Sequence, residues 1–271
     1  MTHCDNGSAL RDRPKRAARS GGLRFLLVVC FGLSVSLCAV RAAHSGDVLT
    51  PGQIQAIVDS SDRSQADRDL DRRRHPAQML AFFGVQPGMV VLDVFTGRGY
   101  TAELLARAVG PDGTVVAQND PIVFEKFLKG QWDPRFSKDL MKNVRTVVSS
   151  LDDPVPADSG PYDLITFIFG YHDSVWMGRD RTAMNRALFQ ALRPGGYLVV
   201  ADHAGNPGTG TTQTETLHRI EESVERAELE AAGFRLVQEG EFLRNPNDPR
   251  DAPFFKSTVA VDQFVLKYQK P

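Results

Sequence analysis

The residues best suited to chemistry lie at positions 90–101, Val-Val-Leu-Asp-Val-Phe-Thr-Gly-Arg-Gly-Tyr-Thr. An apolar run ends in Asp93, and a turn that contains Gly97 and Gly99 leads into a helical pattern. Glycines let the backbone approach a ligand closely, and free N–H groups follow at the start of a helix. A carboxylate at a strand tip, where ligands bind in open α/β sheets, repels a pyrophosphate and attracts a cation. We therefore expect a pocket for a small, positively charged ligand.

Two histidine–aspartate pairs, His172-Asp173 and Asp202-His203, follow later apolar strands. Both pairs would lie at the carboxyl edge of the sheet and face one pocket. We predict His172, Asp173 and His203 as catalytic residues, with a histidine as general base. The alternative is structural, with each histidine satisfied by its neighbouring aspartate. His172, Asp202, His203 and His218 suit a divalent ion by type, yet no spacing matches a known ligand motif, so we predict no metal.

Strands and helical stretches alternate through the middle of the chain, which predicts right-handed crossovers and a Rossmann-like, doubly wound, mostly parallel α/β sheet. We expect strands near 90–93, 115–118, 144–148, 162–168, 197–201, 234–238 and 263–268. We expect helices from 51, over 76–83, 102–110, 184–192 and 214–232. The last two strands have no helix between them and should form an antiparallel pair at the edge. His218 would lie on the last helix, and the N-terminal helices would form a lid or pack on the sheet.

The first 42 residues differ from the rest of the chain. Six basic residues up to Arg24 precede an uncharged apolar run at 25–40, the pattern of an export signal that is cleaved near Ala42. An uncleaved anchor is the alternative, and it would be the only contact with a membrane. We expect a signal at 1–42, an N-terminal helical segment at 43–88 and the ligand-binding domain at 89–271. The protein would be exported, to the periplasm or beyond, without cysteines after cleavage.

The charge of the processed chain argues against a nucleic-acid partner. Seven of 32 basic and two of 33 acidic residues lie within 1–42, which leaves 25 against 31 and a net charge of −6. Binding to phosphate backbones requires clustered positive charge. The mixed-sign run at 67–74, which ends in three arginines, is typical of a solvated helix face. We expect a small-molecule partner.

Two cofactors compete for the glycine turn. The residues from Gly97 to Ala102 also satisfy the dinucleotide pattern G-x-G-x-x-G/A, in which an acidic residue roughly 20 positions later binds the ribose. Asp120 fits that role for either cofactor. Asp93 favours S-adenosylmethionine (SAM), because a carboxylate suits its ammonium and sulfonium groups. An NAD-dependent oxidoreductase is the less favoured alternative.

Over residues 75–271 the chain resembles the class I SAM-dependent methyltransferases. The glycine motif after Asp93, Tyr-Asp-Leu-Ile at 162–165 and Leu-Arg-Pro-Gly-Gly-Tyr-Leu at 192–198 stand in that family's order. Segments 170–173, 201–203 and 216–220 look like a little-characterised bacterial group of predicted, often exported, methyltransferases. The resemblance implies an enzyme that methylates a small or medium-sized acceptor. A SAM-binding protein that lost catalysis is the alternative, because SAM is made in the cytoplasm.

The resemblance also implies cofactor contacts. Asp93, Gly97 and Gly99 would hold the methionine portion, and Asn119 or Asp120 the ribose, although Asn119 stands where the family usually has an acidic residue. Asp152 would lie near the adenine. Further candidates are aromatic residues whose faces favour a cation: Phe95, Tyr100, Phe169 and Tyr171. Methyl transfer is an in-line displacement that depends on positioning and needs no metal.

Overall fold

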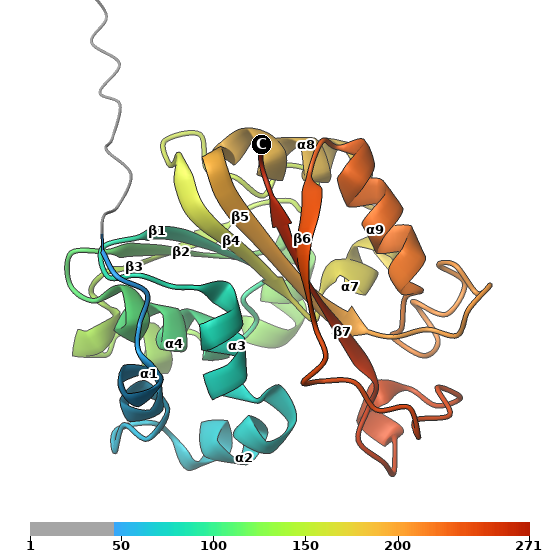
Figure 1. Ribbon diagram of the computed structural model, residues 1–271, viewed down its shortest axis with the longest axis horizontal. Helices are drawn as coiled ribbons and strands as arrows, with labels where there is room; N and C mark the ends of the chain where they lie inside the picture. Colours follow the sequence, from blue (N-terminus) through green and yellow to red (C-terminus); the bar gives the residue numbers. More distant parts are fainter. Residues whose placement is uncertain (1–45) are drawn as a thin grey trace, which may run out of the picture. The chain divides into compact units, whose positions relative to one another are not determined.

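A seven-stranded sheet in the order β3-β2-β1-β4-β5-β7-β6 forms the centre of the protein (Figure 1). The computed structural model describes residues 46–271, so the predicted signal and all three cysteines lie outside the described residues. The strands are β1 (Val90–Val94), β2 (Thr114–Asn119), β3 (Val144–Val148), β4 (Tyr162–Ile168), β5 (Leu192–His203), β6 (Arg235–Gly240) and β7 (Gln263–Gln269).

The strand directions confirm the predicted fold class. β1 pairs in parallel with β2 and β4, and the β2–β3 and β4–β5 pairs are also parallel. β7 runs antiparallel to both β5 and β6, as the missing helix between the last two strands predicted. β1 and β4 are buried along their whole length, which explains their nearly continuous apolar sequence.

Helices cover the two faces of the sheet and form two hydrophobic clusters. The longer ones are α1 (Pro51–Val58), α2 (Gln65–Arg74), α3 (Pro76–Phe83), α4 (Tyr100–Val109), α7 (Tyr171–Trp176), α8 (Arg181–Ala191) and α9 (Glu222–Ala231). Short turns of helix are α5 (Pro121–Val123), η1 (Phe124–Leu128), α6 (Asp133–Phe136), η2 (Asp139–Met141) and η3 (Phe254–Lys256). Val91 belongs to the cluster with α1, α3 and α4, and Leu92 to the cluster with α8 and α9, as strand alternation requires.

The start of α1 and both ends of α3 lie where the sequence predicts. Thr50 and Gln53 form a capping box at the start of α1, and Gly84 ends α3 with a φ of 69°. Both α1 and α3 contact α4, so this segment packs on the core. Among the helices of residues 46–271, none has the length and apolar character needed to cross a membrane.

The predicted helix at 214–232 is wrong in its first half. Only residues 222–231 are helical, and the chain before them forms turns. Ile220 makes a parallel bridge with Ala204, and the fully buried Arg219 pairs with Asp248 at 2.8 Å. These long-range contacts stabilise the turns more than the apolar residues at helical spacing would stabilise a helix. His218, with a φ of 51°, therefore lies on a turn and not on a helix.

Candidate functional site

The turn after β1 has the conformation of a ligand-binding loop. Gly97 and Gly99 have φ values of 58° and 84°, which glycine adopts at little cost. Asn119 holds the turn, because its Oδ1 accepts from the N–H of Gly97 at 3.0 Å and its Nδ2 donates to the Gly97 carbonyl at 2.9 Å. No atom would lie within 4 Å of a Cβ at Gly97, so one side of the peptide is open to a ligand.

Asp93 lies beside this turn as a buried carboxylate with 1% exposure. Its Oδ1 accepts from Thr166 Oγ1 at 2.7 Å, and its Oδ2 accepts from Thr96 Oγ1. Burial raises the pKa of Asp93 to about 6, although both hydroxyls and the positive charge of Arg74 act in the opposite direction. At neutral pH the carboxylate is therefore ionised and would gain from a cation.

Two further predicted residues, Gly99 and Tyr100, form the start of α4. A Cβ at Gly99 would lie 2.7 Å from the ring of Phe136, so this glycine permits close packing of α6. The Tyr100 hydroxyl donates to Asp71 Oδ1 at 2.6 Å, and the Arg74 guanidinium lies 5.3 Å from the centre of the Tyr100 ring. The turn is thus tied to the N-terminal helices.

Asp120 and Asp152 share an arginine that the sequence did not identify. Arg179 lies 2.8 Å from Asp120 Oδ1 and 3.5 Å from Asp152 Oδ2. The other oxygen of Asp120 accepts from the Leu151 N–H at 3.0 Å. The structure therefore brings the two carboxylates together through Arg179, and their contacts to ribose and adenine stay predictions.

Two predicted aromatic cofactor contacts, Tyr171 and Phe95, differ in burial and in their hydrogen bonds. Tyr171 is fully buried in the core, and its hydroxyl donates to Glu228 on α9 at 2.7 Å. Phe95 has a φ of 56° and lies against Gly170, where a Cβ would approach its ring to 2.4 Å. Phe95 is thus part of the loop and packs against the buried cluster that contains Tyr171.

The two predicted histidines are in opposite protonation states. Burial would lower the pKa of His172, but the carboxylates of Asp202 and Asp173, at 2.7 and 3.2 Å, outweigh it and raise that pKa to about 10. His172 is therefore an imidazolium at neutral pH and is not suited to act as a base. Burial and the charge of His172 hold the pKa of His203 well below its usual range. His203 is thus neutral.

His203 forms the middle layer of an aromatic stack. Its ring lies 5.1 Å from that of Phe169 and 4.1 Å from that of Phe254, with interplanar angles of 11° and 17°. Its Nδ1 lies 3.0 Å from Gln263 Nε2. With that amide as donor, the neutral ring carries its proton on Nε2 and is a hydrogen-bond donor.

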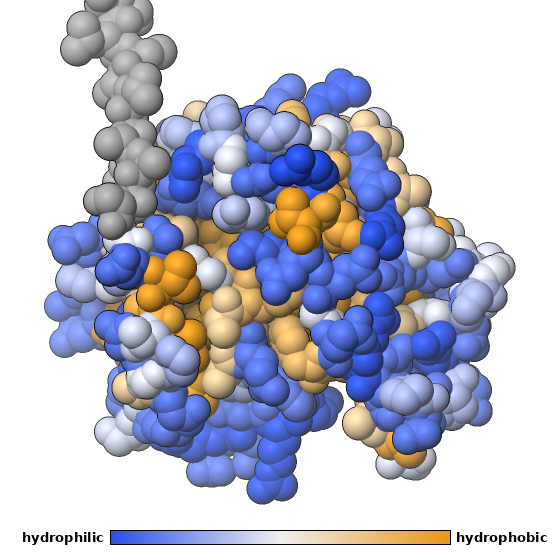
Figure 2. All heavy atoms as spheres, in the orientation of Figure 1, coloured by the Kyte–Doolittle hydropathy of each residue, from blue (hydrophilic) through white to orange (hydrophobic). Residues whose placement is uncertain are grey.

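This stack borders a cavity of about 370 Å³ between the end of α2 and the segment at 242–263. Its lining contains four arginines and no acidic residue: Arg72, Arg73, Arg74, His75, Phe169, His203, Phe242, Leu243, Arg244, Asn245, Phe254, Phe255, Ser257, Val259, Ala260, Val261 and Gln263. We call it the arginine cavity. In Figure 2 a recess separates the side of α2 from the lobe around η3, and hydrophilic residues predominate around it.

The run at 67–74 is only partly the solvated face that the sequence predicted. Asp67 is buried and pairs with Arg135 at 2.8 Å, while Arg74 extends over the ring of Phe169 at 4.8 Å. Arg74 and Phe169 also line a narrower apolar hollow that includes Tyr100 and Thr101 of α4. The arginine cavity and the glycine turn are therefore neighbours at the carboxyl edge of β4.

This sheet order, with the glycine turn and the buried Asp93 at its carboxyl edge, is the Rossmann-like fold that the chain shares with a solved SAM-dependent methyltransferase. The model of the protein-L-isoaspartate(D-aspartate) O-methyltransferase family matches residues 53–226, and the chain belongs to this family. SAM is its cofactor, and two features fit it: the open side of Gly97 and the carboxylate of Asp93.

Other known proteins are similar over parts of the chain. The ubiquinone/menaquinone biosynthesis C-methyltransferase UbiE of Ectopseudomonas mendocina is 31% identical over 126 residues, which is 46% of each chain. The UbiE of Teredinibacter turnerae is 32% identical over 119 residues, 44% of this chain and 45% of the relative. The chain thus matches less than half the length of these relatives.

Solved structures share the fold. A SAM-dependent methyltransferase from Aquifex aeolicus has a TM-score of 0.55 at 20% identity, with 82% of this chain and all of that chain covered. An S-adenosylmethionine-dependent methyltransferase from Mesorhizobium loti has a TM-score of 0.52 at 15% identity, over 74% of this chain and 99% of the other.

Proposed function

We propose that this methyltransferase acts on a small acceptor that carries a negative charge on an aromatic or apolar body and binds in the arginine cavity. The carrying observation is the lining of that cavity, which has four arginines, no carboxylate and a stacked aromatic wall. The volume of about 370 Å³ suits a small or medium-sized ligand.

The charge of the cavity stands out because the rest of the described chain is acidic. Among residues 46–271, Arg72, Arg73 and Arg74 have no ion-pair partner, whereas Arg244 pairs with Glu222. A guanidinium is suited to planar, bidentate recognition of carboxylate and phosphate. Arg74 is held in place by the rings of Tyr100 and Phe169. We infer that Arg74 orients the anionic group of the acceptor.

The residues of the chain would divide the work as follows. SAM supplies a methyl group on a positively charged sulfur. Asp93 and Gly97 hold the methionine portion, Arg74 holds the acceptor, and His203 donates a hydrogen bond into the cavity. Correct positioning of acceptor and donor can supply about 7–11 kcal/mol of the barrier reduction. His172, as an imidazolium, takes no proton from the acceptor.

The names of similar proteins differ in the atom that receives the methyl group. The family name describes an O-methyltransferase of protein L-isoaspartate, and the UbiE relatives are C-methyltransferases. The arginine cavity suits a carboxylate-bearing acceptor whether the methyl group goes to oxygen or to carbon. The cavity therefore predicts the charge of the acceptor and not the atom that is methylated.

The test uses the full chain, SAM with a labelled methyl group, and aromatic carboxylates paired with their neutral amides. We expect transfer to a carboxylate and much less to its amide. Arg74→Ala should raise KM for the carboxylate roughly 10- to 100-fold, the worth of a charge-assisted hydrogen bond. Arg145→Ala, which removes a half-exposed arginine on β3, is the control and should change nothing. Equal use of both acceptor types would refute the proposal.

We further propose that the enzyme works after export from the cytoplasm. Support comes from the basic residues that precede the apolar run at 25–40. Residues 1–42 fused to a reporter enzyme that is active only outside the cytoplasm should confer activity. Replacing the apolar run with polar residues should abolish that activity. If the same segment is fused to a reporter that works only in the cytoplasm and this fusion is active, while the first fusion is inactive, export is contradicted.

A further inference from the structure

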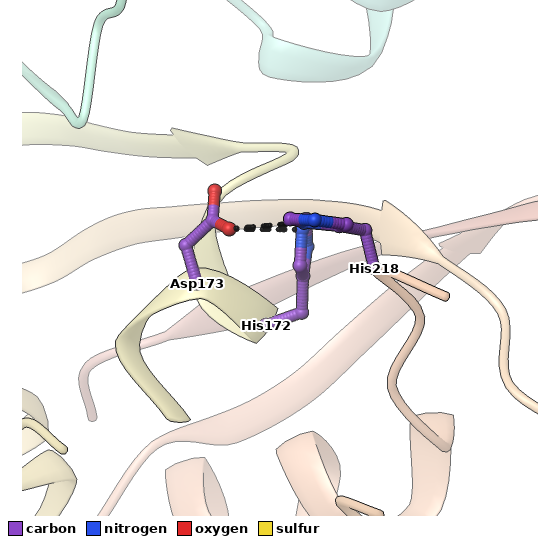
Figure 3. A group of neighbouring side chains, drawn as sticks. All are labelled: His172, Asp173 and His218. Carbon is purple, nitrogen blue, oxygen red and sulfur yellow. Dashed lines mark ion pairs between the residues drawn. The ribbon is translucent and has the colours of Figure 1, made fainter. Parts of the chain in front are cut away.

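We propose that His172, Asp173 and His218 form a binding site for one divalent transition-metal ion, best suited to zinc. Figure 3 shows the three side chains converging from α7 and from the turn that precedes α9. The sequence predicted no metal, because no spacing matches a known ligand motif. His218 lies 45 positions after Asp173 and was expected on a helix. The observed turn at His218 brings it to the pair on α7.

The distances between the three ligand atoms fit a tetrahedral ion. His172 Nε2 lies 3.2 Å from Asp173 Oδ1, and His218 Nδ1 lies 3.4 Å from the same oxygen. All three atoms lie within 4.8 Å of one another. Two ligands at about 2.05 Å from a tetrahedral zinc ion lie about 3.3 Å apart. An ion would fit with small side-chain movements.

A buried nitrogen supports the site independently. His172 Nε2 is buried and has no aligned hydrogen-bond partner among the described residues, although it lies at ion-pair distance from Asp173. The other ring nitrogen, Nδ1, contacts Asp202 Oδ1 at 2.7 Å. Metal-binding histidines commonly donate from their second nitrogen to a carboxylate in this way. Asp202 therefore orients His172 so that Nε2 points to the ion. His172 carries a proton on Nε2 in the metal-free protein, and the ion would displace that proton to solvent as it binds.

The charges around the three ligands and their exposure to solvent suit a bound cation. The carboxylates of Asp173 and Asp202 balance a divalent cation, and the Trp176 indole donates to Asp173 Oδ1 at 2.6 Å and fixes its orientation. Asp173 and His218 are 16% and 28% exposed, so an ion can reach the site from solvent. Two imidazoles and one carboxylate suit zinc and similar ions, and three protein ligands leave a fourth position for water.

A metal here would brace one wall of the arginine cavity. The His218 ring lies 6.1 Å from Phe254 and 5.7 Å from Phe255, and both phenylalanines line that cavity. An ion that joins the turn to α7 would hold His218, and through it these rings, in place. Because the ion binds only the folded site, it would also raise the melting temperature. This inference does not depend on the nature of the acceptor.

The experiment titrates the metal-free full chain with Zn²⁺ against a chromophoric chelator and compares variants. In His218→Ala we expect one ion fewer per chain, or binding weaker by at least about 100-fold, since loss of a ligand should exceed the 10- to 100-fold effect of an outer-shell partner. His75→Asn removes an imidazole at the α2–α3 junction and should bind as the wild type does. Added Zn²⁺ should raise the melting temperature of the wild type and of His75→Asn only.

Two results would overturn the proposal: equal zinc stoichiometry and affinity in the wild type and His218→Ala, or no binding by either. If His218→Ala does not fold, Asp173→Asn replaces it, because it keeps the side-chain shape and removes the charged ligand. Co²⁺ provides a second measurement, since a site with three protein ligands should give the intense visible absorption of tetrahedral cobalt. That absorption should vanish in the variant.

Discussion

Replacing Asp93 with asparagine should make the free protein more stable and the SAM complex weaker. A pKa raised from 3.8 to about 6 means that the ionised carboxylate costs about 3 kcal/mol at neutral pH, at about 1.4 kcal/mol per tenfold change in proton affinity. Asparagine has the shape of the protonated acid. Of the two hydroxyls of Thr96 and Thr166, the one that faces the new amide nitrogen can rotate to accept from it, and the other still donates to the amide oxygen.

The sign of the pH dependence follows from the raised pKa. The folded protein holds the Asp93 proton at pH values where the unfolded chain has lost it, so stability falls as pH rises from about 4 to about 6 and stays low above. Asp93→Asn has no carboxylate to ionise at this position, so its stability should not fall over this pH range. At pH 7.5 it should melt at a temperature up to about 6–12 °C higher, as 3 kcal/mol implies for a domain of this size. Near pH 4 the difference should nearly vanish.

The same substitution removes the charge that attracts the donor. SAM and its demethylated product both carry an ammonium group, so calorimetry should show both binding to Asp93→Asn roughly 10- to 100-fold more weakly. Wild-type affinity should rise as pH increases through about 6. Asp112→Asn, which removes an exposed carboxylate, is the matched control. Unchanged SAM affinity, or a lower melting temperature at pH 7.5, would refute this role of Asp93.

Three further substitutions test the packing around the site. Gly170→Ala should destabilise the protein by about 1–3 kcal/mol in urea unfolding, because its Cβ would lie 2.4 Å from the Phe95 ring. Gly52→Ala, in α1 with open space around it, should stabilise by about 0.5–1 kcal/mol, and loss of stability would contradict the helix there. Arg219→Ala should cost about 3–5 kcal/mol, since it leaves Asp248 buried without its cation; a small effect would show that water compensates.

Much of the fold could be predicted because its signals are local. The apolar runs of β1 and β4, the capping box at Thr50 and the glycine that ends α3 depend on residues close in sequence. The turn at 211–220 could not be predicted in this way. Its conformation follows from the buried Arg219 and its pairing with Asp248, a contact across 29 positions.

The site was predictable where one loop forms it and not where distant segments meet. Gly97 and Gly99 lie in the predicted motif and form the turn that it indicates. The hydrogen bonds of Asn119 to Gly97, across 22 positions, were not predicted. Arg179 and the convergence of His218 on Asp173 depend on how loops fold back, which spacing does not reveal. The run of three arginines that ends in Arg74 is visible in the sequence. Only the structure shows that Arg74 lies over the ring of Phe169.

A crystal structure of the full chain with the demethylated product of SAM tests the role of Asp93 and the arginine cavity most directly. We predict that the amino acid portion of the ligand lies beside Asp93 and the open side of Gly97. We also predict that its sulfur faces Phe169 and the arginine cavity. A ligand whose amino acid portion lies away from Asp93, or whose sulfur faces away from that cavity, would contradict both proposed roles.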